Sequence, residues 1–219
     1  MAEKTEIREL LLEKAKVSFY EKGYQKTSFE YLANECGVTK PTISYYFKNK
    51  VNLANEVYSR YISTIRKLIS ERIMITYGTQ DFLTVSAVQI RMLLEMYHQD
   101  KNAYRFYHEL INCGFTSFSV EPSLNYNRLI HQQYHLDIDE SIDEVQLLTY
   151  AIRGAATSLV VAFFDGNLNC TYEQFMKYRL TIVFKIMNLP ETKIEQILED
   201  ADKIIQDLNF KIKPYFQIV

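Results

Sequence analysis

Residues 37–50, with the sequence GVTKPTISYYFKNK, gather hydroxyl and ammonium groups around one apolar residue, Ile43. The polar side chains are those of Thr39, Lys40, Thr42, Ser44, Tyr45, Tyr46 and Lys50. Hydroxyl groups donate and accept hydrogen bonds at base edges and phosphates, and a lysine can approach a guanine edge or a phosphate. If Val38, Ile43 and Phe47 hold this segment from behind, its polar side stays open. The chemistry that it offers is contact with a nucleic-acid duplex.

The residues before this segment predict two helices. Apolar residues recur at four-residue steps over residues 5–22, which indicates an amphipathic helix. Thr27 and Glu30 have the spacing of a capping box, so we expect a second helix from Ser28 to Cys36. These two helices would support the polar segment.

A tight turn follows the second helix. Gly37 can take the left-handed conformation that ends a helix, Thr39 caps the next one, and Pro41 lies in its first turn, where a missing N–H costs nothing. Two helices joined in this way form a helix-turn-helix, whose second helix lies in the DNA major groove. The segment 37–50 therefore predicts a DNA-reading helix.

Helical periodicity dominates the rest of the chain, and no sustained alternating pattern indicates strands. Further helices are expected over residues 49–75, 80–97, 101–113, 122–135, 141–165, 172–188 and 191–208. The ending cannot stay helical through Pro214. We predict an all-α fold of about nine to ten helices. A helix-turn-helix DNA-binding domain over residues 1–50 would be joined by the long helix from Asn49 to a helical ligand-binding and dimerisation domain over residues 51–219.

The N-terminal residues resemble the TetR family of bacterial transcriptional regulators. The resemblance runs through FYEKGY at 19–24, Thr27-Ser28, Leu32-Ala33, GVTK at 37–40, Thr42-Ile43 and YYFKNK at 45–50. It implies a dimeric repressor with an N-terminal DNA-binding domain and a larger C-terminal domain that binds an effector and dimerises. The chain departs from the family pattern at Ser44, where tyrosine is usual, and at Val51-Asn52, where acidic residues are common.

Carried over by position, the resemblance assigns DNA contacts to individual residues. The residues expected at phosphates are Thr27 or Ser28, Tyr45 and Lys50. The residues expected to face bases are Lys40, Pro41, Thr42, Ser44 and Tyr46. Thr27, Ser28 and Thr39 also start helices, where free amides and the helix dipole favour a phosphate.

Charge and cysteine content restrict the class of protein. The net charge of −2 argues against a protein that coats nucleic acid with its whole surface, but residues 1–67 carry +4 and the remainder −6. The three cysteines fit neither a disulfide framework nor a metal knuckle. Neither a signal peptide nor a membrane-spanning apolar run is recognised, so we expect a cytoplasmic protein with no membrane partner.

The segment 141–165 carries the pattern expected of a dimer interface. Apolar residues from Val145 to Ala162 recur at steps of three and four, beside a stripe of small residues formed by Ala151, Gly154 and Ser158. Small residues allow helices to approach closely, so we expect this segment and 172–188 to pair with their copies as a four-helix bundle. Both helices could instead fill the monomer core.

Aromatic residues and all four histidines are concentrated in residues 97–135. An apolar pocket with a few polar groups has this composition, and so has an aromatic core. The residues assigned to an effector pocket are Tyr97, Tyr104, Tyr107, His108, Phe115, Tyr126 and Ile130. His131 and His135 have a spacing that can bind zinc, but a third ligand is not evident and Gln132 replaces the glutamate of a metalloprotease helix.

The sequence therefore predicts a ligand-responsive regulator. Its partners would be a palindromic double-stranded DNA operator, a second copy of the chain, and a small, largely apolar or aromatic effector that releases the repressor. The alternative is a helical ligand-binding or scaffolding protein with a vestigial helix-turn-helix. No catalytic triad, phosphate loop or carboxylate cluster is recognised, so we expect no enzyme activity, cofactor or metal.

Overall fold

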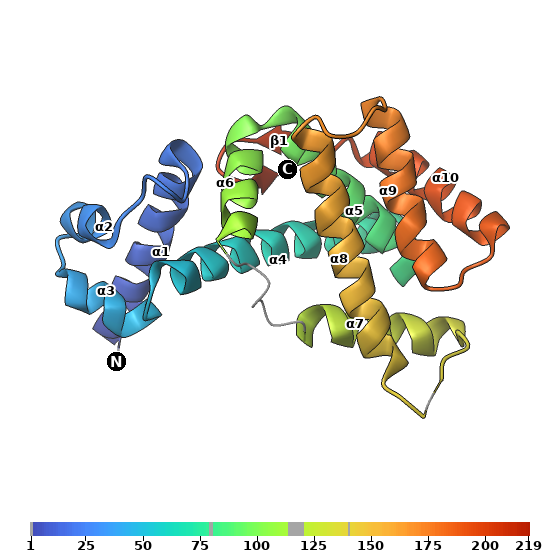
Figure 1. Ribbon diagram of the computed structural model, residues 1–219, viewed down its shortest axis with the longest axis horizontal. Helices are drawn as coiled ribbons and strands as arrows, with labels where there is room; N and C mark the ends of the chain where they lie inside the picture. Colours follow the sequence, from blue (N-terminus) through green and yellow to red (C-terminus); the bar gives the residue numbers. More distant parts are fainter. Residues whose placement is uncertain (1, 79–80, 114–120, 140) are drawn as a thin grey trace. The chain divides into compact units, whose positions relative to one another are not determined.

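The computed structural model describes residues 2–78, 81–113, 121–139 and 141–219 (Figure 1). The described residues form ten α-helices, which confirms the all-α prediction. The helices are α1 (Ala2–Lys22), α2 (Phe29–Cys36), α3 (Lys40–Phe47), α4 (Lys50–Tyr77), α5 (Phe82–Gln99), α6 (Lys101–Asn112), α7 (Glu121–Tyr134), α8 (Glu144–Phe164), α9 (Tyr172–Ile186) and α10 (Glu191–Leu208).

The chain ends in a short hairpin that the sequence pattern did not predict. Strand β1 (Ile212–Lys213) pairs antiparallel with β2 (Gln217–Ile218), with Ile212 opposite Ile218. Strands of two residues are too short for an alternating pattern to be recognised. Pro214 lies in the turn, so the prediction that no helix continues through it is confirmed.

The chain folds into two compact units. Unit 1 consists of residues 1–68, 95–118 and 210–219, and unit 2 of residues 69–94 and 119–209. Helices α4 and α5 pass from one unit to the other along the chain. This division follows packing and differs from the predicted functional boundary after residue 50, which stays a prediction.

The core of unit 1 joins α1, α2, α3, α4 and α6. The apolar face of α1 buries Leu11, Ala15 and Phe19 completely. Phe19 stacks on Phe106 of α6 with ring centroids 5.2 Å apart. Helix α2 contributes Leu32, which is also fully buried. The periodicity of α1 therefore fixes which side of the helix carries the helix-turn-helix.

Three caps set the boundaries of α2, α3 and α4. The Ser28 hydroxyl accepts from the Tyr31 amide, Thr39 caps α3, and the Asn49 side chain accepts from the Asn52 amide at 2.8 Å. Gly37 ends α2 at φ 64°, in the left-handed region that glycine adopts without strain. The cap predicted at Thr39 is confirmed, and Asn49, where the long helix was expected to start, caps α4.

The predicted capping box at Thr27 is wrong, because α2 starts one residue later. Ser28 is the N-cap, and its extended backbone (φ −115°, ψ 159°) directs its hydroxyl to the Tyr31 amide. Both residues are good capping types, so composition does not separate them. Burial distinguishes the two residues, because Thr27 is buried in the core of unit 1.

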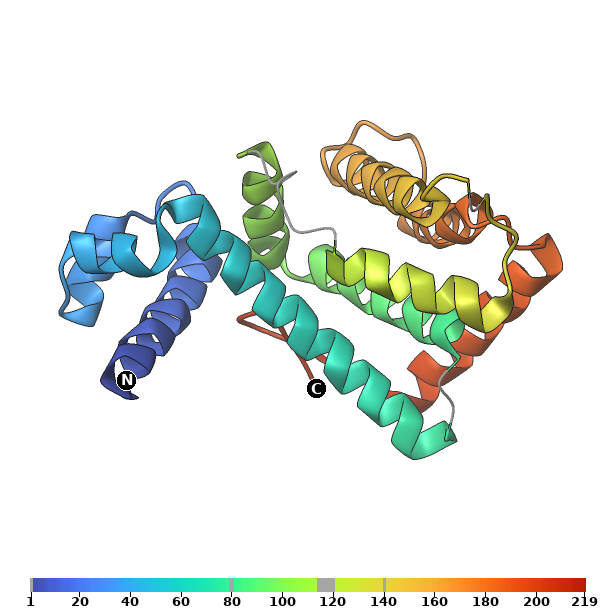
Figure 2. The same ribbon diagram turned by 90° about the horizontal axis from the view of Figure 1, so that it is seen from below.

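Unit 2 contains α7–α10 and the adjoining parts of α4 and α5. Helix α8 contacts both α7 and α9, and Figure 2 shows α8 and α9 side by side. Helix α9 buries Phe175, Leu180 and Phe184, whereas α10 buries Ile194 and Ile197. Helix α8 buries much less of its apolar surface than these neighbours do.

The length and composition of α8 correct the prediction that no segment could span a membrane. This helix is long and apolar enough to do so by length and composition, with a mean hydropathy of 1.6 over an 18-residue window. Only 11% of that window is buried within the chain. Helix α8 is therefore an apolar helix with little of its surface covered by the described chain.

Candidate nucleic-acid interface

Two buried residues anchor α3. Ile43 is 0% exposed and Phe47 is 3% exposed, whereas Val38, the third predicted anchor, is only half-buried. Ile43 and Phe47 are four residues apart and share one side of the helix. The other side of α3 is therefore presented to solvent, as the sequence predicted.

The polar residues of α3 differ in how far they are exposed. Lys40, Pro41 and Tyr45 are exposed, and the Tyr45 side chain reaches 70%. Thr42, Ser44 and Tyr46 are half-buried. A hydroxyl or ammonium group on this side can reach a partner without any change in the packing of Ile43 and Phe47.

Contacts within α3 orient several of these groups. The hydroxyl oxygens of Thr39 and Thr42 are 2.9 Å apart, and the Thr39 hydroxyl also accepts from the Thr42 amide. The rings of Tyr45 and Tyr46 meet edge to face at 5.2 Å, and Tyr46 lies 6.2 Å from Phe47. Tyr46 is thus held between an exposed ring and a buried one, which limits its rotamers.

Thr27 is not available to a phosphate, contrary to the prediction. Its side chain is 0% exposed, its hydroxyl donates to the Gly23 carbonyl at 2.8 Å, and the Ser18 hydroxyl lies 2.9 Å away. Its amide donates to the Tyr24 carbonyl. Thr27 therefore fixes the α1–α2 connection. The predicted phosphate contact was assigned to Thr27 or Ser28, and of these two residues only Ser28 is exposed.

Lys50 has a role within the chain that the sequence did not indicate. Its Nζ donates to the Tyr24 carbonyl at 3.0 Å and lies 4.2 Å from the centre of the Tyr24 ring. Burial raises the pKa of the Tyr24 phenol to about 12, so the ring stays neutral beside the ammonium. Lys50 thus joins the start of α4 to the end of α1.

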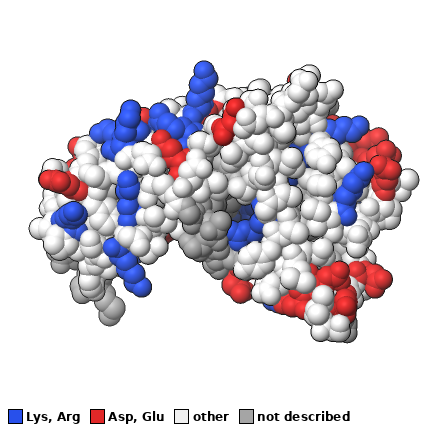
Figure 3. Space-filling view, in the orientation of Figure 1, with Lys and Arg blue, Asp and Glu red and all other residues white. Residues whose placement is uncertain are grey.

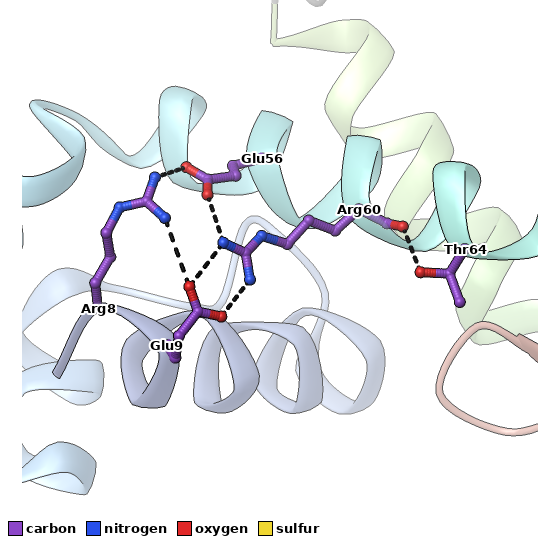
Figure 4. Close-up of polar contacts among 5 residues, drawn as sticks. All are labelled: Arg8, Glu9, Glu56, Arg60 and Thr64. Atoms are coloured by element: carbon purple, nitrogen blue, oxygen red, sulfur yellow. Dashed lines mark hydrogen bonds and ion pairs between the residues drawn. The ribbon is translucent and has the colours of Figure 1, made fainter. Parts of the chain in front are cut away.

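An ion-pair network connects α1 with α4 (Figure 4). Arg8 bonds Glu56 at 2.6 Å, and Arg60 contacts both Glu9 and Glu56. The Arg8 guanidinium also lies 5.2 Å from the centre of the Phe47 ring. The Arg60 hydrogen bond lowers the pKa of the Glu9 carboxyl. This network joins α1 to α4, and Arg8 extends it to the last residue of α3.

The sequence contained one signal for this network. Glu56 and Arg60 are four residues apart on a predicted helix, a spacing that favours ion pairing. Their partners on α1 lie about fifty positions away, so only the folded chain brings them together.

Charged side chains on the described surface are divided as the sequence predicts, with a net positive charge over residues 1–67 and a net negative charge over the remainder. Figure 3 shows lysine and arginine side chains over α1–α3 and a group of acidic side chains around the connection between α7 and α8. That connection contains Asp137, Asp139 and Asp143, and α8 begins at Glu144. The basic surface therefore includes the helices with exposed hydroxyls, which suits a polyanion.

The residues predicted for an effector pocket fall into both units. Tyr97, Tyr104, Tyr107 and His108 belong to unit 1, where Tyr97 stacks on Tyr107 at 4.8 Å and Tyr104 packs on His108 at 5.6 Å. Burial raises the pKa of Tyr97 well above its usual value, so this phenol is neutral. These contacts are those of an aromatic core, which was the alternative reading.

Tyr126 and Ile130 belong to unit 2. The Tyr126 hydroxyl donates to the Phe82 carbonyl at 3.0 Å and accepts from Ser86 at 2.9 Å, and Ile130 is buried. Phe115 lies outside the described residues. Whether these residues contact an effector stays a prediction.

His131 is a buried polar residue of unit 2 outside the set assigned to the effector pocket. It is 5% exposed, and neither ring nitrogen has a hydrogen-bond partner among the described residues. Burial lowers the pKa of this imidazole, against the opposing effect of Glu144, so it is neutral at neutral pH. Four residues earlier on α7, the Asn127 amide donates to the Thr149 hydroxyl at 2.8 Å.

The two histidines considered for zinc do not share a helix face. Helix α7 ends at Tyr134, and His135 lies beyond it with φ 49° and an exposed side chain. Within the described residues, no group of three or more His, Cys, Asp or Glu side chains could hold a metal ion. The helical spacing of His131 and His135 was wrong because the helix ends between them.

The fold and this site are those of an all-α protein with a helix-turn-helix near its N-terminus. Residues 11–57 match the family model described as bacterial regulatory proteins, tetR family. The resemblance stated from the N-terminal residues is therefore confirmed over residues 11–57.

Solved structures of regulators share the fold. RolR in complex with resorcinol has a TM-score of 0.63 and 12% identity, over 92% of this chain and 96% of that one. FadR of Thermus thermophilus, a TetR-family repressor in complex with lauroyl-CoA, has a TM-score of 0.61 and 16% identity, over 84% and 96%. TylP of Streptomyces fradiae has a TM-score of 0.53 and 15% identity, over 94% and 97%. A comparison with curated protein sequences gave no match.

Proposed function

We propose that this protein is a ligand-responsive repressor that binds a palindromic operator through α3. The observation that carries the proposal is the build of α3, where Ile43 and Phe47 are buried and the opposite side carries hydroxyl, phenol and ammonium groups. Lys40, Pro41, Thr42, Ser44 and Tyr46 would face base edges. Ser28, Thr39 and Tyr45 would contact phosphates, and Lys50 would add charge from its place beside Tyr24.

The active form would be a homodimer that pairs through α8 and α9. Leu147, Tyr150 and Gly154 lie at three- and four-residue steps on α8 and are exposed. A Cβ added at Gly154 would meet nothing within 4 Å, so this stripe is open. Tyr178 adds an exposed ring on α9. Small and apolar residues along one open stripe suit close pairing with a second copy.

A dimer explains this surface better than a membrane does. Arg153 lies near the middle of α8, and the helix also carries Gln146, Thr149 and Ser158. Polar groups of this kind are costly in the hydrocarbon of a bilayer. A two-fold dimer also supplies the two reading helices, about 34 Å apart, that a palindromic operator requires. We therefore propose a cytoplasmic protein without a membrane partner.

The effector would be a small, largely apolar or aromatic molecule with at least one hydrogen-bonding group. Apolar residues dominate the interior of unit 2, while His131 offers a buried donor and acceptor. The solved structures of RolR and FadR hold an aromatic diol and an acyl thioester. By its differential affinity, such a ligand would favour a state of the dimer whose reading helices no longer fit the operator.

A gel-shift series tests the proposal directly. The probes are a duplex from the region upstream of the protein's own gene and a random duplex of equal length and base composition. The protein is expected to prefer the upstream duplex, and its affinity should fall as salt concentration rises. Equal affinity for the two duplexes, or binding that salt does not affect, would contradict it.

The effector is tested on the preformed complex. A panel of phenols, fatty acyl thioesters and their apolar parent compounds is added to the protein with the upstream duplex. Release by members of one chemical class, with no release by the others, is expected. If the panel releases nothing while operator binding is intact, the proposed effector class is wrong.

A further inference from the structure

We propose that the C-terminal strap, residues 210–219, is a positioning element for the DNA-binding helices and that operator recognition requires it. The inference rests on the proposed DNA-binding function and adds to it a segment outside the helix-turn-helix. The strap belongs to unit 1, together with α1 and the N-terminal half of α4. Its evidence is a set of side-chain contacts with three helices of that unit.

Phe216 is the centre of the strap. Its ring is 2% exposed and stacks on Tyr61 of α4, with ring centroids 4.5 Å apart and an interplanar angle of 10°. It also meets Tyr20 of α1 edge to face at 5.2 Å and lies 5.4 Å from Phe106 of α6. One side chain from the end of the sequence thus joins helices that begin more than a hundred residues earlier.

The neighbours of Phe216 extend the contact along α1. The Tyr215 ring lies 4.6 Å from the Tyr20 ring, and its hydroxyl donates to the Glu21 carboxylate at 2.8 Å. The Glu21 hydrogen bond raises the pKa of Tyr215, because it favours the neutral phenol. Ile218 is buried as well. The strap therefore covers the end of α1 that leads into α2.

The backbone of the strap indicates that these contacts determine its shape. Tyr215 and Phe216 have φ values of 61° and 59°, a left-handed conformation that is unfavourable for residues other than glycine. A hairpin of two-residue strands is not stable by itself in water. Burial of Phe216 among three aromatic rings compensates for the unfavourable backbone.

The helices that the strap joins are those that place α3. Helix α1 packs against α2, α2 packs against α3, and α4 begins at Lys50, three residues after α3 ends. A change in how α1 packs on α4 would move the reading helix. Two reading helices must fit the operator at once, whereas binding to random DNA depends mainly on charge. Loss of the strap should therefore weaken binding to the operator more than binding to random DNA.

Phe216→Ala in the chain of residues 1–219 is the main test. The probes are the upstream duplex that the wild-type protein prefers and the random duplex. We expect the ratio of operator to random affinity to fall about tenfold, the effect of losing one good base contact. The dependence of binding on salt should stay as in the wild type, because the strap supplies no phosphate contact.

Ile197→Ala is the matched control. Ile197 is a buried residue of α10 in unit 2, outside the proposed α8–α9 interface, so its truncation also removes core volume. This control is expected to lower stability while the affinity ratio stays close to that of the wild type. An equal fall in the ratio for both variants would show a general loss of stability and would overturn the proposal.

Two milder variants keep the test decisive if Phe216→Ala does not fold. Tyr215→Phe removes only the hydroxyl that bonds Glu21, and Phe216→Trp keeps an aromatic ring in a chain that has no other tryptophan. Phe216→Trp should keep the affinity ratio within about twofold of the wild type and give the blue-shifted emission of a buried indole. Tyr215→Phe should lower the ratio slightly.

The outcomes separate the two proposals. A wild-type protein that prefers the upstream duplex, together with a Phe216→Ala variant that prefers it equally, would overturn the role of the strap alone. Solvent-exposed emission from Phe216→Trp in a variant that still binds the operator would do the same. A wild-type protein without any preference would remove the proposed function and this inference with it.

Discussion

Helices α3 and α8 expose opposite kinds of surface. Helix α3 buries Ile43 and Phe47 and presents hydroxyls, phenols and Lys40, whereas α8 presents Leu147 and Gly154 with little of its apolar length covered. A polar, basic surface suits a charged and hydrated partner, while a stripe of small and apolar residues suits a copy of itself. The proposed regulator needs both surfaces, because a palindromic operator is bound by two copies of α3 and the second copy comes from the dimer.

The two helices also differ in how they are supported. Helix α3 has eight residues, is capped by Thr39, and meets the α1–α4 network where Arg8 lies over Phe47. Helix α8 has twenty-one residues and contacts α7 and α9. A short reading helix is thus placed by other elements, whereas a long interface helix forms a surface by its own periodicity.

The largest expected effect comes from the α8 stripe. Leu147→Arg places a charge in the proposed interface, so we expect a monomer near 25.9 kDa in light scattering. The loss of paired binding should weaken operator affinity by about a hundredfold or more. Glu195→Arg, on an exposed position of α10, is the control and should remain dimeric. A dimeric Leu147→Arg variant would contradict the assignment of this stripe.

The next largest effect concerns base reading by α3. Lys40→Ala and Thr42→Ala should each change which bases are preferred, at a cost of about 1–3 kcal/mol on the best operator. Tyr45→Ala should weaken binding to operator and random duplex alike. Competition binding against a library of operator variants measures the difference. Uniform losses from all three variants would show that the base and phosphate roles are assigned wrongly.

Substitution of Thr27 tests whether its hydroxyl stabilises the fold or contacts a phosphate. Thr27→Val removes the hydroxyl that bonds the Gly23 carbonyl and lies next to Ser18, so we expect a loss of about 1–3 kcal/mol in the free energy of unfolding. Ser28→Ala should cost about 1 kcal/mol through loss of the α2 cap. Urea unfolding measures both. A Thr27→Val variant that loses DNA affinity without any loss of stability would restore the predicted phosphate contact.

The smallest effect is the pH dependence of the α1–α4 network. The Glu9 pKa is lowered from 4.5 in the folded chain, so the ion pair stabilises the fold above that pH, and this contribution is lost as pH falls through the lowered pKa. Glu9→Gln should cost less than about 1 kcal/mol near pH 7, because the pair is largely exposed. The difference from wild type should vanish in acid. A difference that persists there would point to packing instead of charge.

The sequence by itself determined the fold class and the helix-turn-helix segment. Four-residue periodicity gave α1, and Gly37, Thr39 and Asn49 ended or began helices where the structure has them. These signals are local, because caps and turns involve residues within four positions of each other. The small residues Ala151, Gly154 and Ser158 of α8 are exposed side by side, as the period of one helix predicts, whereas Val145 of the predicted apolar stripe is buried.

Only the tertiary structure decided which of these residues are available. Thr27 and Ser28 are adjacent and chemically alike, but packing on α1 buries the first and leaves the second exposed. Lys50 bonds a carbonyl twenty-six residues away, and Phe216 joins α1, α4 and α6 from the end of the chain. No local pattern encodes such contacts, because they form only when distant segments are packed together and water is excluded between them.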